Sequence, residues 1–175
     1  TTYRGELQYE WHSLFKYTYV SGDGTASGGV WDVRSANIPL TDAKRGDFYS
    51  QGGYDLLLRV SPFDSNCVVI GGTNLYCSTD GFTTTANNTW IGGYDKEDPY
   101  WDKYSLYPNH HPDQHDVVFH PTQPDVLISV NDGGIQRTDN VRASRVSWTD
   151  LNRGYLTTQF YTVDQEAAEG SSKLI

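Results

Sequence analysis

Short apolar runs separated by turn residues make up the hydrophobic pattern of this chain. Residues 54–60 and 67–71 are rich in Leu, Val and Ile, and each run ends at a turn signal, Ser61-Pro62 or Gly71-Gly72. Short runs of this composition between Gly, Pro, Asn and Asp predict β-strands. The one helix candidate is the short segment 165–170. The pattern therefore predicts an all-β protein.

The run of strands returns in altered form after about 60 residues, a period typical of stacked or circular repeats. Each copy is expected to hold four short antiparallel strands, which is the make-up of a β-propeller blade. We therefore predict a partial β-propeller with four-stranded antiparallel blades. The expected strands are 54–60, 67–71, 74–78 and 89–93 in the first copy, and 116–120, 126–131, 135–138 and 147–151 in the second.

This pattern divides the chain into five segments. Further strands are expected upstream at 7–11, 15–20 and 30–34, around a Gly/Ser-rich loop. A closed propeller needs about four to eight blades, so we expect the others to come from a longer chain or from other chains. The segments are 1–53, a degenerate blade with a Gly/Ser-rich loop; 54–94, a blade with the Asp-box; 95–114, a long aromatic and acidic loop; 115–155, a second blade; and 156–175, the start of a further, truncated blade.

Composition narrows the class of protein. Aromatic residues are frequent, with 13 Tyr, 6 Phe and 5 Trp, and 17 Gly serve the turns, which suits pleated sheets. The net charge of -9 argues against nucleic acid as a partner, because phosphate binding needs a basic surface. No apolar run is long enough for a transmembrane helix. We expect a secreted protein with no cofactor, although its acidity leaves room for a calcium ion.

The two cysteines leave two interpretations open. Cys67 and Cys77 flank a predicted hairpin over 68–76 and have the same strand parity, so their side chains should point to one face. A cross-strand disulfide would imply an oxidising compartment. Two free, half-buried thiols are the alternative, because the geometry of a disulfide is demanding.

The turn after the third predicted strand resembles the Asp-box of BNR β-propellers, which reads S-x-D-x-G-x-T-W. Residues 78–81, Ser-Thr-Asp-Gly, match the front of the box; Phe82 replaces its second Gly, and Trp90 follows after an insertion. A more divergent copy occurs near residue 138. The resemblance implies that the acidic residues bond to local backbone N–H groups and stabilise turns. The structural Asp-box residues are then Ser78, Asp80, Trp90, Thr138, Asp139 and Trp148.

A wider series of motifs, over residues 46–165, is similar to secreted bacterial propellers. These proteins are common in Bacteroidetes-type bacteria and are often described as sortilin-like or xyloglucanase-like repeat proteins; many leave the cell by type IX secretion. The resemblance implies an extracellular or outer cell-surface location and a chain that continues into further blades. The motifs are Tyr54-Asp55, 111–115, 131–135, 148–152 and 158–161.

The loop over 94–114 is long for a compact domain, and long loops are often functional. Its aromatic rings could stack on sugars while its carboxylates bind hydroxyl groups. The alternative is that the rings plug one face of the propeller or pack on a neighbouring domain. The candidate rings are Tyr100, Trp101, Tyr104 and Tyr107.

Imidazoles and carboxylates crowd the start of the second blade, where His111, Asp113 and His115 enter its first strand and Asp132 should turn nearby. Such groups could bind a ligand, hold a metal or act as general acid and base. Their spacing matches no standard zinc motif, so we predict no metal. The preferred interpretation is a hydrogen-bonded network that pins the strand, with His115 and Asp113 buried.

These observations favour a binding and scaffold module over an enzyme. We expect it to engage a glycan or a protein partner through the face that carries 94–115 and 131–134, and to work with other blades or as a subunit of a surface assembly. The alternative is part of a xyloglucanase-like glycoside hydrolase whose catalytic carboxylates lie mostly outside this segment. Glycoside hydrolysis needs a pair of carboxylates across a cleft, and no such pair can be chosen from the sequence.

Overall fold

Antiparallel β-strands make up nearly all of the regular structure in the computed structural model, which describes residues 3–4, 11–39, 47–95 and 105–155. Two short 3-10 turns, Ala26–Gly28 and Ser35–Asn37, accompany them, and the described ranges contain no α-helix. The prediction of an all-β protein is therefore confirmed. No helix in these ranges is long and apolar enough to span a bilayer.

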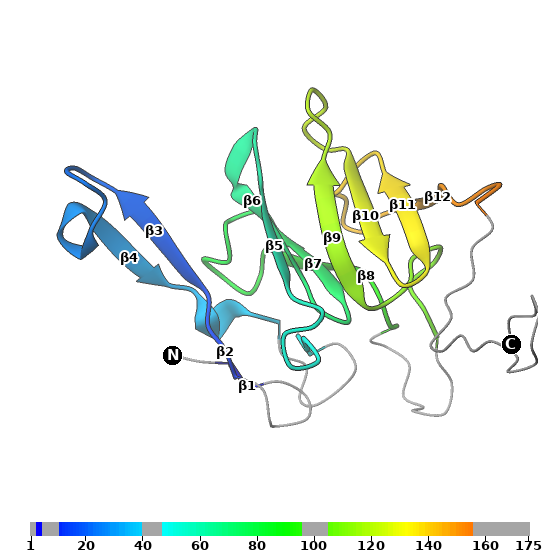
Figure 1. Cartoon of the computed structure of the whole chain (residues 1–175), viewed down its shortest axis with the longest axis horizontal. Helices are drawn as coiled ribbons and strands as arrows, with labels where there is room; N and C mark the ends of the chain where they lie inside the picture. Colours follow the sequence, from blue (N-terminus) through cyan, green and yellow to red (C-terminus); the bar gives the residue numbers. More distant parts are fainter. Residues whose placement is uncertain (1–2, 5–10, 40–46, 96–104, 156–175) are drawn as a thin grey trace, which may run out of the picture.

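Two four-stranded sheets form the body of the molecule (Figure 1). Within each sheet the strands follow one another in sequence order, and every neighbouring pair is antiparallel. The first sheet contains β5 (Leu57–Ser61), β6 (Asp64–Gly71), β7 (Leu75–Ser78) and β8 (Asn88–Gly92). The second sheet contains β9 (Gln114–Phe119), β10 (Leu127–Asn131), β11 (Gly134–Thr138) and β12 (Thr149–Asp150).

The eight strands expected over 54–151 are all present, with shifts at their ends. The first strand begins at Leu57 rather than Tyr54, because residues 51–55 form a turn in which the Asp55 N–H binds the Ser50 carbonyl oxygen. The last strand is two residues long instead of five, with Thr149 paired to Arg137 and Asp150 to Gln136.

The N-terminal part, where a degenerate blade is expected over 1–53, is described only in part. Its described residues contain the hairpin of β3 (Phe15–Tyr19) and β4 (Gly29–Val33) and a separate pair, β1 (Tyr3–Arg4) with β2 (Trp11–His12). The hairpin projects away from the first sheet (Figure 1). Its strands leave large apolar side chains exposed, including Trp31 at 58 %. Residues 156–175, with the expected further blade and the helix candidate, lie outside the described ranges.

The first sheet is covered on both faces because its side chains alternate along each strand. Cys67 and Val69 of β6 point into one apolar cluster, and Val68 and Ile70 point into another. The first cluster is shared with the second sheet through Val117, Leu127, Val141, Val146 and Trp148, and the second is shared with the N-terminal part through Ile38 and Phe48.

The two sheets stack with β5 and β9 side by side (Figure 1). Val117 of β9 and Leu127 of β10 are fully buried against the first sheet. The other face of the second sheet is open in the described part of the chain, where Val118 is 53 % exposed and Ile135 is 40 % exposed. Neighbouring sheets in a propeller stack in this way, but the ranges that the structure describes show no closure into a ring.

Candidate functional site

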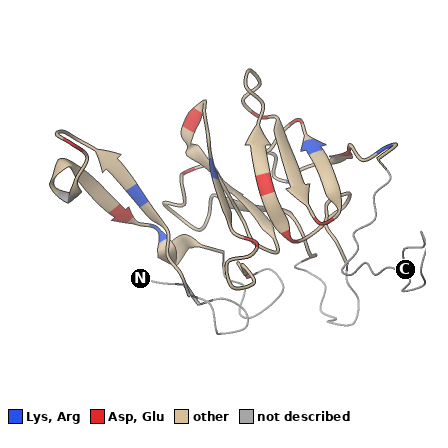
Figure 2. Ribbon diagram, viewed as in Figure 1, with Lys and Arg blue, Asp and Glu red and all other residues tan. Residues whose placement is uncertain are grey.

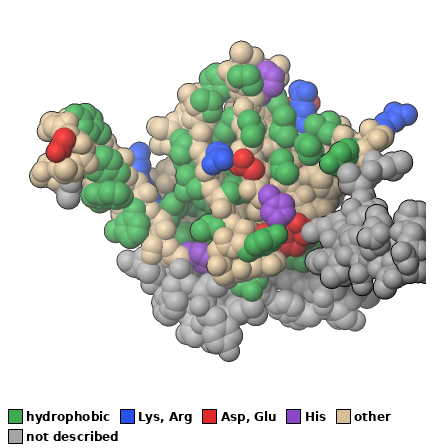
Figure 3. Space-filling view, in the orientation of Figure 1, with side chains coloured by type: hydrophobic (Ala, Val, Ile, Leu, Met, Phe, Trp, Pro, Cys, Tyr) green, Lys and Arg blue, Asp and Glu red, His purple; other side chains and the backbone are tan. Residues whose placement is uncertain are grey.

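Four ionisable side chains meet near the points where β5 and β9 begin. Asp55 precedes β5, Asp113 precedes β9, His115 lies in β9, and Asp132 lies in the turn between β10 and β11. We call these four residues the acidic cluster. Nε2 of His115 lies 2.6 Å from Oδ1 of Asp132, and its Nδ1 lies 3.9 Å from Oδ1 of Asp55. Acidic residues near these strand ends are visible in Figure 2, and a histidine beside acidic side chains in Figure 3.

Backbone contacts hold the acidic cluster together. Asp113 has a positive φ of 62° and donates its N–H to the Thr73 carbonyl oxygen, and the Asp132 N–H binds the Asp113 carbonyl oxygen. Few residues other than Gly adopt such a φ readily, and Asp is one of them. Nε2 of Gln51 donates to the Asp113 carboxylate at 2.9 Å. Three turns far apart in sequence thus meet at one point.

Asp55 is the unusual member of the cluster because it is fully buried. Neither of its carboxylate oxygens accepts a hydrogen bond from a donor in the part of the chain that the structure describes. Burial raises its pKa to about 6, assisted by the negative charge of Asp113. Burial and the charge of Asp132 also raise the pKa of Asp113. Two neighbouring carboxyl groups of this kind are expected to share a proton.

The position of Asp55 limits its chemistry. A general acid must reach the proton acceptor of a substrate, and a fully buried carboxyl group does not reach a glycosidic oxygen at the surface. No group of three or more His, Cys, Asp or Glu side chains in the described ranges is placed to hold a metal ion. His115 is not buried as expected, since its side chain is 35 % exposed, and Asp113 is only half-buried.

A second polar group, centred on His110, connects the two sheets. The Ser129 hydroxyl donates to Oε1 of Gln114, so its oxygen accepts from Nε2–H of His110 at 3.0 Å. The His110 ring packs on Trp148 with centroids 4.3 Å apart, and a Cβ on Gly92 would collide with it. The indole N–H of Trp148 in turn donates to the Ile91 carbonyl oxygen of the first sheet at 2.6 Å. Burial lowers the pKa of His110 to about 3.

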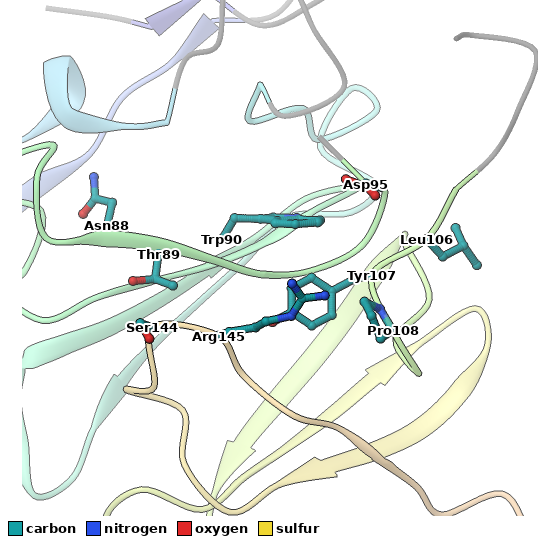
Figure 4. Close-up of a pocket in the computed structure, with 9 residues that line it drawn as sticks. All are labelled: Asn88, Thr89, Trp90, Asp95, Leu106, Tyr107, Pro108, Ser144 and Arg145. Atoms are coloured by element: carbon teal, nitrogen blue, oxygen red, sulfur yellow. The ribbon is translucent and has the colours of Figure 1, made fainter. Parts of the chain in front are cut away.

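A cavity of about 660 Å³ opens beside β8 (Figure 4). We call it the Trp90 cavity. Asn88, Thr89 and Trp90 come from β8, and Ser144 and Arg145 come from the segment after β11. The remaining walls come from Asp95, which follows β8, and from Leu106, Tyr107 and Pro108, which precede β9.

The Trp90 cavity combines an aromatic wall with polar groups. Trp90 is half-buried, and its ring meets Tyr107 edge to face with centroids 4.6 Å apart. Thr89, Ser144, Asp95 and Arg145 contribute hydroxyl, carboxylate and guanidinium groups around it. A cavity of this size suits a small ligand of one or two sugar rings.

The structure separates the aromatic residues that the sequence grouped together. Tyr107 does not offer an exposed ring: it is 3 % exposed, its hydroxyl donates to the Val146 carbonyl oxygen at 2.7 Å, and it belongs to the core between the sheets. Burial raises the pKa of this hydroxyl. Tyr100, Trp101 and Tyr104 lie outside the described residues. His111 lines a neighbouring pocket, its Nδ1 lies 3.0 Å from the Pro112 carbonyl oxygen, and it is close enough to the acidic cluster to act electrostatically on Asp113.

The first Asp-box is a hydrogen-bonded turn. One carboxylate oxygen of Asp80 accepts from the Ser78 hydroxyl and the Thr83 N–H, and the other accepts from Thr84 and the Asn87 amide. Burial acts to raise the pKa of Asp80, but these hydrogen bonds outweigh it and lower the pKa to about 2. Asp80 therefore has a structural role in this turn.

In the second copy of the Asp-box, Asp139 does not have the role that the resemblance implies. Asp139 is exposed and pairs with Arg137 at 2.7 Å rather than binding backbone N–H groups. Strand pairing explains this: Ser78 pairs with Val68 and Thr138 with Leu127 at the same point of each sheet, so Asn140 is the structural equivalent of Asp80. Oδ1 of Asn140 accepts from the Arg142 N–H at 3.1 Å.

We expect Asp80→Ala to lower the free energy of unfolding by about 2 kcal/mol, because it removes several hydrogen bonds to a charged group. Asp139→Ala is the matched control, since its carboxylate is 77 % exposed and such pairs contribute little. Urea unfolding of both variants at pH 7 measures the difference. Equal stability of the two variants would contradict the role given to Asp80.

Cys67 and Cys77 are free thiols in this structure, and both are buried. They share a face, as predicted, but Cys77 pairs with Val69, so the two cysteines are diagonal neighbours rather than directly opposite. Their sulfur atoms are 4.0 Å apart, about twice the length of a disulfide bond.

No protein-family model matches the chain, and neither the curated proteins nor the solved structures include a significant match. The site must therefore be interpreted from its own geometry. Asp95 was expected only as one of the carboxylates of the loop over 94–114, Asp55 only as part of the Tyr54-Asp55 motif, and Arg145 was not singled out from the sequence. Asp55 could have been noticed as a carboxylate next to an apolar strand. No local signal marks Arg145, which meets Trp90 only through the stacking of the sheets.

Proposed function

We propose that this chain is a binding module of a propeller-type scaffold and that it holds a glycan in the Trp90 cavity. The observation that carries this proposal is the cavity itself, in which an aromatic ring on a rigid strand is surrounded by polar groups. Sugar rings present apolar faces that stack on aromatic side chains, and hydroxyl groups that need hydrogen-bond partners.

The position of the Trp90 cavity supports this function. Its walls are fixed by two packed sheets, and Trp90 itself packs against both apolar clusters. A preformed wall reduces the entropy that ligand binding costs. The resemblance to Asp-box propellers of the bacterial surface agrees with a glycan ligand and an extracellular location, and neighbouring blades would cover the open face of the second sheet.

We expect the wild-type chain to bind at least one class of oligosaccharide on an array of neutral and acidic glycans. Trp90→Leu should weaken that binding by about tenfold or more, which corresponds to about 1.4 kcal/mol. Ser144→Phe should also block binding, because Ser144 is an exposed residue on the cavity wall and a ring there would fill the space. Calorimetry with the best glycan measures both effects.

Trp31→Leu is the matched control, since Trp31 is an exposed tryptophan on the distant β3–β4 hairpin and should not matter for binding. Ser144→Phe keeps the experiment decisive even if Trp90→Leu destabilises the fold. Absence of binding to every glycan would contradict the proposal, as would binding that survives both cavity variants.

A further inference from the structure

Arg145 stands out among the charged residues near the Trp90 cavity. It is exposed, it lines the cavity, and it makes no hydrogen bond or ion pair within the described part of the chain. Four other arginines in the described ranges have carboxylate partners: Arg34 with Asp32, Arg59 with Asp116, Arg137 with Asp139, and Arg142 with Asp64 and Asp125. Arg153 is exposed and lies outside the cavity wall, so Arg145 is the arginine that brings an unpaired guanidinium to the Trp90 cavity.

The other charged group in the cavity wall does not neutralise Arg145. Asp95 takes part in an interaction of its own within the chain, and no ion pair joins it to Arg145. The guanidinium of Arg145 extends toward Tyr107 (Figure 4), and its positive charge acts on the Tyr107 hydroxyl. The cavity thus places one available cation near the aromatic ring of Trp90.

A guanidinium group binds a carboxylate through two parallel N–H···O bonds, which gives both affinity and orientation. We propose that the Trp90 cavity selects a glycan that contains a uronic acid, with Arg145 bound to its carboxylate. This inference rests on the proposed glycan-binding function and adds the class of sugar. Thr89 and Ser144 lie beside Arg145 in the cavity wall and can bind sugar hydroxyl groups.

The net charge of the chain makes this selectivity testable. A protein with a net charge of -9 repels polyanions in general, so binding of an acidic glycan must come from a local site. Calorimetry should compare short oligomers of galacturonic and glucuronic acid with their neutral methyl esters, which keep the sugar ring and remove the charge. We expect the acid forms to bind about tenfold more tightly than the esters.

Arg145→Gln should remove the difference between acid and ester, because the amide keeps a polar N–H donor but is shorter and has no charge. Arg153→Gln is the matched control: Arg153 is also exposed but lies outside the cavity wall, and the variant should keep the preference. A sulfated neutral oligosaccharide serves as a third probe. We expect it to bind less well than the uronate, because a tetrahedral sulfate matches the planar guanidinium less closely.

Each outcome has a distinct meaning. Equal affinity for acid and ester, or a preference that survives Arg145→Gln, would overturn the uronate inference and leave glycan binding standing. Stronger binding of the sulfated probe would overturn the assignment of a carboxylate. Failure of every glycan to bind would overturn the proposed function itself, which the neutral oligosaccharides on the array test separately.

Discussion

Asp55→Asn should raise the free energy of unfolding at pH 7.5 by about 2–3 kcal/mol. The reason is that folding buries the Asp55 carboxyl without a hydrogen-bond donor and raises its pKa from 3.8 to about 6. Above pH 6 the folded chain must therefore hold a buried negative charge, and one unit of pKa shift corresponds to about 1.4 kcal/mol. Asparagine has the same shape, carries no charge and can donate to Asp113.

The sign of the pH dependence follows from the raised pKa. The folded state binds the proton of Asp55 more tightly than the unfolded state, so this group favours the folded chain at low pH. That contribution is fully present below the unfolded pKa of 3.8 and is lost as the pH rises through about 6. Asp55→Asn should abolish this part of the pH dependence.

Urea unfolding followed by tryptophan fluorescence at several pH values measures both effects. Asp116→Asn is the control, because Asp116 forms a half-exposed pair with Arg59 and should change stability by less than about 1 kcal/mol. A loss of stability in Asp55→Asn at pH 7.5 would show that the Asp55 charge is compensated in the fold and would contradict our description of the acidic cluster.

His110→Gln should change the pH dependence in the opposite direction. His110 is 3 % exposed, and its pKa falls from 6.5 to about 3 in the folded state because burial disfavours the imidazolium. The unfolded state therefore binds a proton between these values and the folded state does not. The contribution is fully present above pH 6.5 and is lost as the pH falls, by about 3 kcal/mol at pH 4.

Glutamine keeps an N–H donor for Ser129 but loses the ring that packs on Trp148, so we expect the variant to be less stable than the wild type at pH 7. The deficit should shrink by about 3 kcal/mol between pH 7 and pH 4, because only the wild type carries the buried imidazole. This change does not depend on the packing loss, which is the same at both pH values. A constant deficit would contradict the burial of a neutral His110.

The two titrations oppose each other in the wild type, and their separate effects appear only in the variants. Asp80, with a pKa of about 2, contributes at still lower pH and does not disturb this window. The double variant Asp55→Asn/His110→Gln should therefore depend less on pH between pH 4 and pH 7 than either single variant.

The two four-stranded sheets could be predicted because short apolar runs between turn residues recur along the chain. A strand that is buried on both faces gives such a run, since its side chains alternate between two apolar clusters. In β6, for example, Cys67 and Val69 face one cluster and Val68 and Ile70 the other. The start of β5 was misplaced because Tyr54 and Leu56 precede its apolar residues, whereas the hydrogen bond from the Asp55 N–H to the Ser50 carbonyl oxygen closes a turn there and moves the strand boundary. The pairing of the strands cannot be inferred from local sequence either. It shows that Asn140, and not Asp139, is the structural equivalent of Asp80.

The site was less predictable than the sheets because it depends on how the sheets stack. Trp90 lies in β8 of the first sheet, and Arg145 lies between β11 and β12 of the second. Both line the Trp90 cavity because the two sheets stack. Asp55 and Asp113 belong to separate turns that are joined by hydrogen bonds through Thr73. Tyr107 was expected to offer its ring to a ligand, but the ring is buried in the core and its hydroxyl donates to the Val146 carbonyl oxygen. Side-chain chemistry was visible in the sequence, whereas burial was not.

The most direct test of glycan binding at the Trp90 cavity follows the tryptophan indole N–H signals by NMR during titration with the best glycan from the array. We expect the Trp90 signal to move with saturation, since its ring lines the cavity. The Trp148 signal should stay in place, because that indole is buried and bound to the Ile91 carbonyl oxygen. A titration in which Trp90 does not respond while another tryptophan does would contradict the assignment of the site.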